Sequence, residues 1–131
     1  MKPLKTFLVL AFIFAANTIS AQSTFEKWPA IKEFHGVMSQ TFHPAEEGNF
    51  APIKVRSEEM MIKAKLVVQS DIPAAFKTEA IVAAAGKLET QSAVLNKLVT
   101  SGAANEAIFI SLNNLHDIFH DIVGLCSEEK K

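Results

Sequence analysis

Two histidines four residues apart, His116 and His120, lie in the segment LHDIFHDIVGLC, residues 115–126. On an α-helix, residues i and i+4 share a face, so the two imidazoles can approach each other. Such a pair has the geometry to hold one transition-metal ion, and a third ligand from a facing helix would complete a three-nitrogen site with an open position. The spacing therefore predicts a metal site. The alternative is a pair of hydrogen-bonded histidines within a helical core.

The other two histidines of the chain, His35 and His43, lie near its N-terminal end, with Met38 between them. His35 falls at the centre of an apolar helical stripe, where a histidine is either a hydrogen-bonded core residue or a ligand. His43 lies on the flank of that stripe, before Pro44, where it either ends the helix or joins a site. Met38 either fills the core or serves copper(I) as a thioether ligand, because copper(I) prefers soft donors.

Acidic side chains lie close in sequence to both groups of histidines. Glu46 and Glu47 could supply a carboxylate ligand if their loop folds back, and are otherwise solvated loop charges. Asp117 and Asp121 adjoin the second group, where they are better placed to hydrogen-bond to ligands or to face solvent than to bind the ion. A carboxylate ligand is therefore expected from the loop rather than from these aspartates.

The segments that must position these groups have helical character. Within each, apolar residues recur at three- and four-residue spacing, and prolines and glycines separate the segments. Pro44 is expected to end the first helix, Pro73 to break the chain after the second, and Gly102 to cap the third. Asn105 is expected to cap the fourth. The expected helices cover about residues 26–43, 52 or 57 to 70, 74–100 and 105–126.

The apolar faces of these helices favour a bundle. In the second helix, the residues expected to face the core are Ile53, Met60, Ala64, Val67 and Val68. No run of alternating apolar and polar residues bounded by turn signals indicates a sheet. The sequence therefore predicts an all-α fold, an antiparallel up-down-up-down four-helix bundle that follows a signal peptide.

In such a bundle the first and fourth helices are antiparallel neighbours. If residue 26 is level with residue 126, His35 is level with about residue 117, between the paired histidines. If the register is shifted by about two turns, His43 takes that place instead. All four histidines thus fall on the two helices that are expected to touch.

Residues 1–21 have the pattern of a secretory signal peptide, with a basic start, the apolar block TFLVLAFIFAA, and small and polar residues up to Ala21. Its removal leaves residues 22–131 as one four-helix domain, which we expect to be exported, either periplasmic or secreted. The apolar block is too short to span a bilayer comfortably and no second one follows, so no permanent membrane anchor is expected.

The charge and cysteine content narrow the classes of partner. Without Lys2 and Lys5, 11 basic residues face 14 acidic ones, a net charge of −3 that has no attraction for nucleic acid. The single cysteine, Cys126, excludes an intramolecular disulfide, and its place on the apolar stripe of the last helix indicates a packed small hydrophobe. Stability must therefore come from packing, to which a bound ion or cofactor can add.

In size and layout, the chain after residue 21 resembles the exported four-helix bundles of the cytochrome c′ and cytochrome b562 class. This resemblance implies haem held between the first and fourth helices, with a methionine or histidine from one and a histidine from the other as axial ligands. Met38 or His35, with His116 or His120, would take those places. The segment GLCSEE has one cysteine and no following histidine, so covalent haem attachment through Cys-x-x-Cys-His is excluded.

The chain also resembles small exported proteins of uncharacterised role from the Bacteroidota. The resemblance lies in the SAQ cleavage region, in FHGVMSQTFHPAEEGNFAPIK and in LHDIFHDIVGLC. It implies a metal-binding bundle. The ligand set that it implies is His35, His43, Glu47, His116 and His120.

No catalytic motif is present, so an enzymatic activity has no positive support, and no protein partner is indicated. HDIFH lacks the glutamate of the His-Glu-x-x-His metalloprotease motif, and the di-iron Glu-x-x-His signature is absent. The leading hypothesis is binding of a divalent transition metal, zinc or copper, between the first and fourth helices. The alternatives are a non-covalent haem b electron carrier and a cofactor-free interaction or stress protein.

Overall fold

The computed structural model describes residues 23–128, and its secondary structure is helical. No strand occurs within this range, which confirms the all-α class. The predicted signal peptide, residues 1–21, lies outside the described residues. A helical stretch at 23–27 precedes α2 (Pro29–Glu46), α3 (Ala51–Gln69), the short 3-10 helix η1 (Ala74–Phe76), α4 (Glu79–Thr100) and α5 (Asn105–Glu128).

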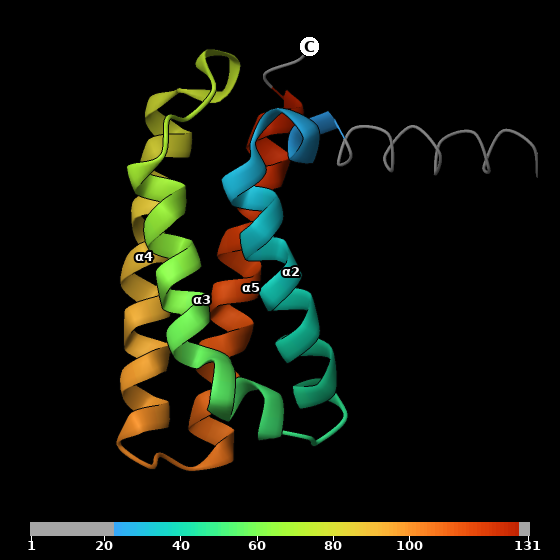
Figure 1. Cartoon of the computed structure of the whole chain (residues 1–131), viewed down its shortest axis with the longest axis vertical. Helices are drawn as coiled ribbons and strands as arrows, with labels where there is room; N and C mark the ends of the chain where they lie inside the picture. Colours follow the sequence, from blue (N-terminus) through green and yellow to red (C-terminus); the bar gives the residue numbers. More distant parts are fainter. Residues whose placement is uncertain (1–22, 129–131) are drawn as a thin grey trace, which may run out of the picture.

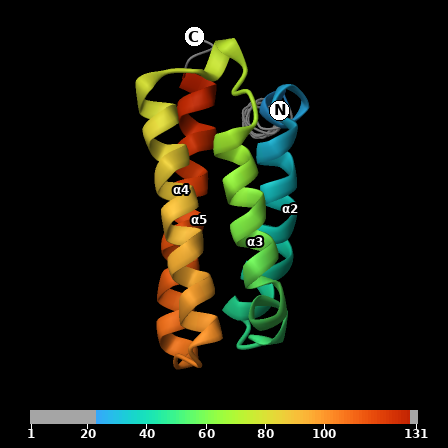
Figure 2. The same ribbon diagram turned by 60° about the vertical axis from the view of Figure 1, so that its left-hand side comes forward.

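The four long helices lie side by side (Figures 1 and 2). α3 packs against α2 and α4, and α5 packs against α4 and α2. The connections at 47–50 and 101–104 lie at one end of the molecule, and the connection at 70–78 lies at the other (Figure 1). The first and last long helices therefore meet, although they are far apart in the sequence.

One hydrophobic core fills the space between the helices, to which each of the four long helices contributes a stripe of apolar residues. Full burial of one large apolar side chain contributes about 1.5–3 kcal/mol. In α3 the prediction for Val68 is wrong, because this side chain is 38% exposed. It lies about 100° around the helix from its buried neighbour Val67. The inward face of α3 is already filled by Ile53, Ser57, Met60, Ala64 and Val67.

The end of α2 differs from the prediction that Pro44 stops the helix, because α2 continues to Glu46. Proline has no backbone N–H, so the helix lacks one hydrogen bond at this position but does not end there. The Pro44 carbonyl accepts hydrogen bonds from the N–H groups of Glu47 at 3.0 Å and Asn49 at 2.9 Å, which close the turn. Gly48, with a φ of 90°, then redirects the chain.

The start of α2 also differs from the predicted helix, which begins at residue 26. Trp28 interrupts the helical conformation with φ −130° and ψ 82°, because it precedes Pro29, the first residue of α2. Its side chain is 1% exposed, and its ring stacks on that of Phe76 at a centroid distance of 6.2 Å. This contact fastens the 70–78 connection to the start of α2.

The predicted third helix, 74–100, consists of two elements, η1 and α4. Thr78 caps α4, and its Oγ1 accepts a hydrogen bond from the Ile81 N–H at 3.2 Å. The cap supplies a partner for one of the four amides that a helix start leaves free. The sequence contains the signal for this start, since Thr-Glu precedes an apolar run. Burial of Phe76 shapes the connection instead of allowing one continuous helix.

The turn between α4 and α5 follows the prediction at one residue and departs from it at another. Gly102 has a φ of 76°, the left-handed conformation expected where a helix ends. α5 begins at Asn105, but the Ile108 N–H donates to the Ala104 carbonyl at 3.1 Å. Ala104 therefore holds the capping position, and Asn105 is the first helical residue.

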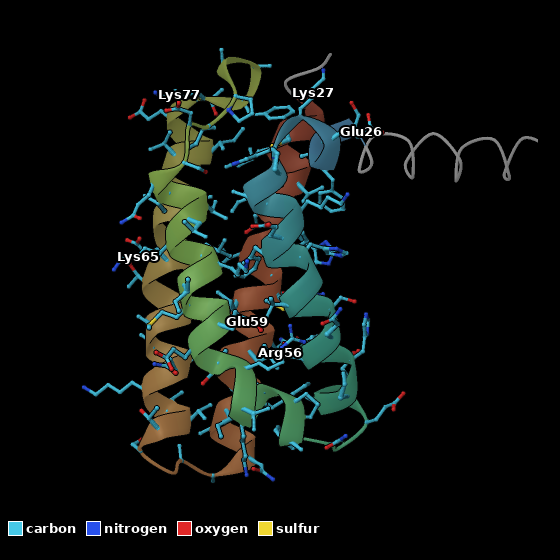
Figure 3. All side chains as sticks on the ribbon, in the orientation of Figure 1. Glu26, Lys27, Arg56, Glu59, Lys65 and Lys77 are labelled. Carbon is cyan, nitrogen blue, oxygen red and sulfur yellow. The ribbon has the colours of Figure 1, made fainter. Side chains whose placement is uncertain are left out.

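Charged side chains lie on the outside of the described structure. The Arg56 guanidinium donates to both carboxylate oxygens of Glu59, at 2.9 and 3.0 Å, along one turn of α3 (Figure 3). Lys65 and Lys77 are exposed and lie on the outer surface of the molecule (Figure 3). None of the helices in residues 23–128 combines the length and the apolar character needed to cross a membrane.

The Thr78 cap gives a prediction for stability. Replacement of Thr78 by alanine leaves the Ile81 amide without its side-chain partner and should lower the free energy of unfolding by about 1 kcal/mol. Urea unfolding followed by far-UV circular dichroism measures this change. Thr90→Ala is the matched control, because its hydroxyl donates only to the Gly86 carbonyl within α4. Equal losses in the two variants would contradict the capping role.

Candidate metal centre

The candidate site lies between α2 and α5, whose interface is built from aromatic rings. The rings of Phe34 and Phe119 are 5.9 Å apart, and those of Phe42 and Phe109 are 6.2 Å apart. Such offset or tilted pairs contribute about 0.5–1.5 kcal/mol beyond the area that they bury. They also set the helix register, which is close to the first of the two predicted registers.

A small cavity of about 30 Å³ lies beside these rings, and the four histidines of the chain line it. This volume is on the scale of one water molecule or one metal ion. The interface thus brings together imidazoles that come from opposite ends of the chain. The lining residues are His35, Met38, Ser39, Phe42 and His43 from α2, and His116, Phe119 and His120 from α5.

The closest pair is the one with i, i+4 spacing. Nε2 of His116 and Nε2 of His120 are 3.1 Å apart, so that one ring carries a proton and donates it to the other. His116 is half-buried, with its ring stacked on Phe42 at 3.9 Å and 6°. His120 is exposed, because the polar face of α5 begins at this position. The stacking holds the His116 ring while the His120 ring is open to solvent.

His35 is half-buried and lies on the α5 side of the apolar stripe, not at its centre as predicted. The centre is displaced because α2 packs against α3 as well as α5, so that Val37 and Thr41 are also buried. The His35 ring contacts those of Phe25, at 4.9 Å, and Phe119, at 5.3 Å, and these two rings also contact each other at 6.4 Å. These two contacts restrict the orientation of the imidazole.

His43 is paired with a carboxylate from its own helix. Its Nδ1 is 3.1 Å from Oε1 of Glu46, with both side chains largely exposed. This pair forms because α2 continues past Pro44, which places Glu46 one turn after His43. Glu47, the carboxylate in the predicted ligand set, is exposed at the C-terminal cap of α2 and does not line the cavity.

The electrostatics of the site favour neutral imidazoles. Burial is the main cause that lowers the pKa of His35 below its ordinary value of 6.5, and repulsion from His120 and His43 adds to it. Burial likewise lowers the pKa of His116, with repulsion from His120 as the next cause. Asp117 and Glu46 act in the opposite direction on His116. A neutral imidazole keeps the lone pair that a metal ion needs.

Within residues 23–128, no three His, Cys, Asp or Glu side chains lie close enough to form a ready set of metal ligands. The two α5 histidines are therefore close enough to each other to bind one ion together. The two α2 histidines line the same cavity but lie farther from that pair. Sequence reasoning did not identify the ring partner of His116, Phe42, or the Glu46–His43 pair. The Glu46–His43 pair could have been predicted from the sequence, because residues three apart on one helix are neighbours.

No protein-family model, no curated protein and no solved structure matches this chain. The interpretation of the site therefore depends on its own geometry and chemistry.

The lowered pKa values of His35 and His116 predict an acid-dependent loss of stability. In the unfolded chain both groups titrate near 6.5, so the unfolded state binds protons before the folded state does. Their contribution is present above pH 6.5 and is lost as the pH falls from there through the folded-state values. Urea unfolding in the presence of a chelator should give a lower free energy of unfolding at pH 5.5 than at pH 7.5.

The variant for this test is His35→Gln combined with His116→Gln, which removes both titrating groups. Its free energy of unfolding should vary less between the two pH values than that of the wild type. A wild-type curve that is flat, or that rises on acidification, would contradict the effect. Equal slopes in the variant and the wild type would assign the effect to other groups.

Proposed function

We propose that this protein binds a divalent transition-metal ion, zinc or copper, between α2 and α5. One observation carries the proposal: Nε2 of His116 and Nε2 of His120 are 3.1 Å apart at a cavity of about 30 Å³ that His35 and His43 also line. Export after removal of residues 1–21 and an antiparallel up-down-up-down bundle belong to the same proposal. The apolar leader-like segment and the alternating ends of the helix connections support them.

The spacing of the two nitrogens fits chelation of one ion. With metal–nitrogen bonds of about 2.0–2.1 Å, two nitrogens 3.1 Å apart subtend an angle of about 100° at the ion. This angle is close to that of a tetrahedral site. Metal binding replaces the proton shared between the rings, so the ligand-free protein needs little rearrangement of α5. Because the His116 ring is already held against Phe42, this residue loses little side-chain entropy when the ion binds.

The remaining coordination positions are open to α2 or to water. His43 is suited to the role because its Nδ1 faces Glu46, which leaves Nε2 available for a metal. Carboxylate–imidazole contacts of this kind fix the tautomer and make the imidazole a better donor. We therefore assign to Glu46 the positioning of His43, and to the exposed Glu47 no direct bond to the ion.

The size of the cavity favours an ion over haem. Sites for organic ligands have volumes on the order of 300–1,000 Å³, whereas this cavity has about 30 Å³. Haem would have to separate Phe119 from Phe34 and His35, which are in ring contact. A metal ion leaves these contacts in place.

Metal analysis tests the proposal. Protein purified without a histidine tag and loaded with zinc or copper should retain about one ion per chain after removal of free metal. The double variant His116→Ala, His120→Ala should retain none, because the chelating pair is lost. Inductively coupled plasma mass spectrometry measures the metal content.

The control is Asn113→Ala combined with Asn114→Ala, two exposed positions on the same helix that do not line the cavity. This control should bind metal as the wild type does, and circular dichroism should show equal helix content in all three proteins. Equal metal content in the wild type and the histidine double variant would refute the proposal.

The role of Glu46 gives a second test. Glu46→Ala removes the acceptor for the His43 Nδ1–H and should weaken zinc binding by about tenfold, the lower end of the range for such supporting contacts. Competition with a chromogenic zinc chelator measures the dissociation constant. The comparison is Glu47→Ala, at the next residue. A larger loss from Glu47→Ala than from Glu46→Ala would show that Glu47 is the ligand and that the assignment to Glu46 is wrong.

A further inference from the structure

One residue that lines the cavity carries a donor of a different chemical kind, Met38 with its thioether sulfur. This residue lies on α2 one turn before Phe42, is 1% exposed, and lines the same cavity as the two α5 histidines. Thioethers are soft, uncharged ligands that bind copper(I) well and zinc poorly. Met38 therefore gives the cavity a preference that its histidines alone do not have.

The other possible donors on α2 are held by their own contacts. The His35 ring packs in a cluster with those of Phe25 and Phe119, and His43 is paired with Glu46 toward solvent. Rotation of the His35 ring toward the ion gives up some of these contacts, and the imidazole of His43 is a harder donor than a thioether. Methionine has three rotatable bonds in an unbranched side chain, so its sulfur can adjust at a lower cost.

We propose that the site is selective for copper in the Cu(I) state, which is held by Met38 and by the imidazoles of His116 and His120. This inference rests on the proposed metal-binding function and refines it, because it replaces the divalent ion with monovalent Cu(I) and names the third ligand. Two nitrogens and one sulfur form an uncharged three-coordinate set, which suits the low coordination number and soft character of Cu(I).

The walls of the cavity favour the same ion. Phe42 stacks on His116 at 3.9 Å, and Phe119 lies against His35 at 5.3 Å, so that the ion would be enclosed mainly by rings. Cu(II) prefers tetragonal coordination by nitrogen and oxygen, which requires more ligands or water. Two nitrogens and one sulfur do not supply such a coordination set, which disfavours Cu(II).

The test compares two metals in three proteins. Cu(I) affinity is measured anaerobically by competition with bicinchoninate, and Zn(II) affinity by competition with a zinc chelator. Met38→Leu keeps the volume and apolar character of the side chain but removes the sulfur. It should weaken Cu(I) binding by about tenfold or more and change Zn(II) binding by less than about threefold. Met60→Leu is the matched control, since Met60 is fully buried on α3 and does not line the cavity.

X-ray absorption spectroscopy of the Cu(I)-loaded wild type gives a second measurement. It should show one sulfur scatterer at about 2.3 Å in addition to nitrogen, and this signal should be absent in Met38→Leu and present in Met60→Leu. Equal weakening of both metals by Met38→Leu would assign a packing role to Met38 and overturn the proposal. Unchanged Cu(I) affinity in Met38→Leu would overturn it as well.

The two proposals fail in distinguishable ways. If the wild type binds neither Cu(I) nor Zn(II), or if His116→Ala, His120→Ala leaves both affinities unchanged, the metal-binding function itself is wrong. The wild type could instead bind Zn(II) through the histidine pair but bind Cu(I) no more tightly than Met38→Leu does. In that case only the copper(I) selectivity is wrong.

Discussion

The packing of aromatic rings between α2 and α5 is the interaction on which the site depends. Phe119 contacts both Phe34 and His35, and Phe42 stacks on His116, so a few rings fix how the two helices lie against each other. A displacement of one helix by a single turn would separate these rings and disperse the imidazoles. The same contacts that stabilise the interface therefore gather the imidazoles.

The cluster of imidazoles also imposes an electrostatic constraint on the fold. Half-buried histidines that face one another cannot all be protonated without repulsion, and burial adds to this penalty for His35 and His116. This repulsion is avoided when the rings are neutral. The rings of His35 and His116 pack on phenylalanines, and those of His116 and His120 share one hydrogen bond. An ion at the His116–His120 pair would meet the constraint in another way, because it replaces a shared proton with a stronger partner. Stability and the proposed metal affinity would thus be coupled at this interface.

Sequence periodicity located the helices more reliably than their ends. Spacing of three and four residues reflects burial of one face, a property of the whole helix, whereas an end depends on a few local bonds. Pro44 is predicted to end the first helix. The helix instead continues past Pro44, whose carbonyl accepts the hydrogen bonds that close the following turn. The pattern also does not reveal Thr78 as a cap. The reason is that apolar residues continue through the connection, where Phe76 is buried against Trp28. The exposure of Val68 shows the same limitation for a residue at the edge of a stripe.

The sequence by itself determined that the chain is helical and that its four histidines lie near opposite ends of it, since both follow from residue order and helical geometry. Only the tertiary structure decided which groups share a cavity. It placed Met38 there and moved His35 to the edge of the stripe. The physical reason is that ring packing across α2 and α5 depends on residues far apart in the chain, whose distances no local pattern encodes.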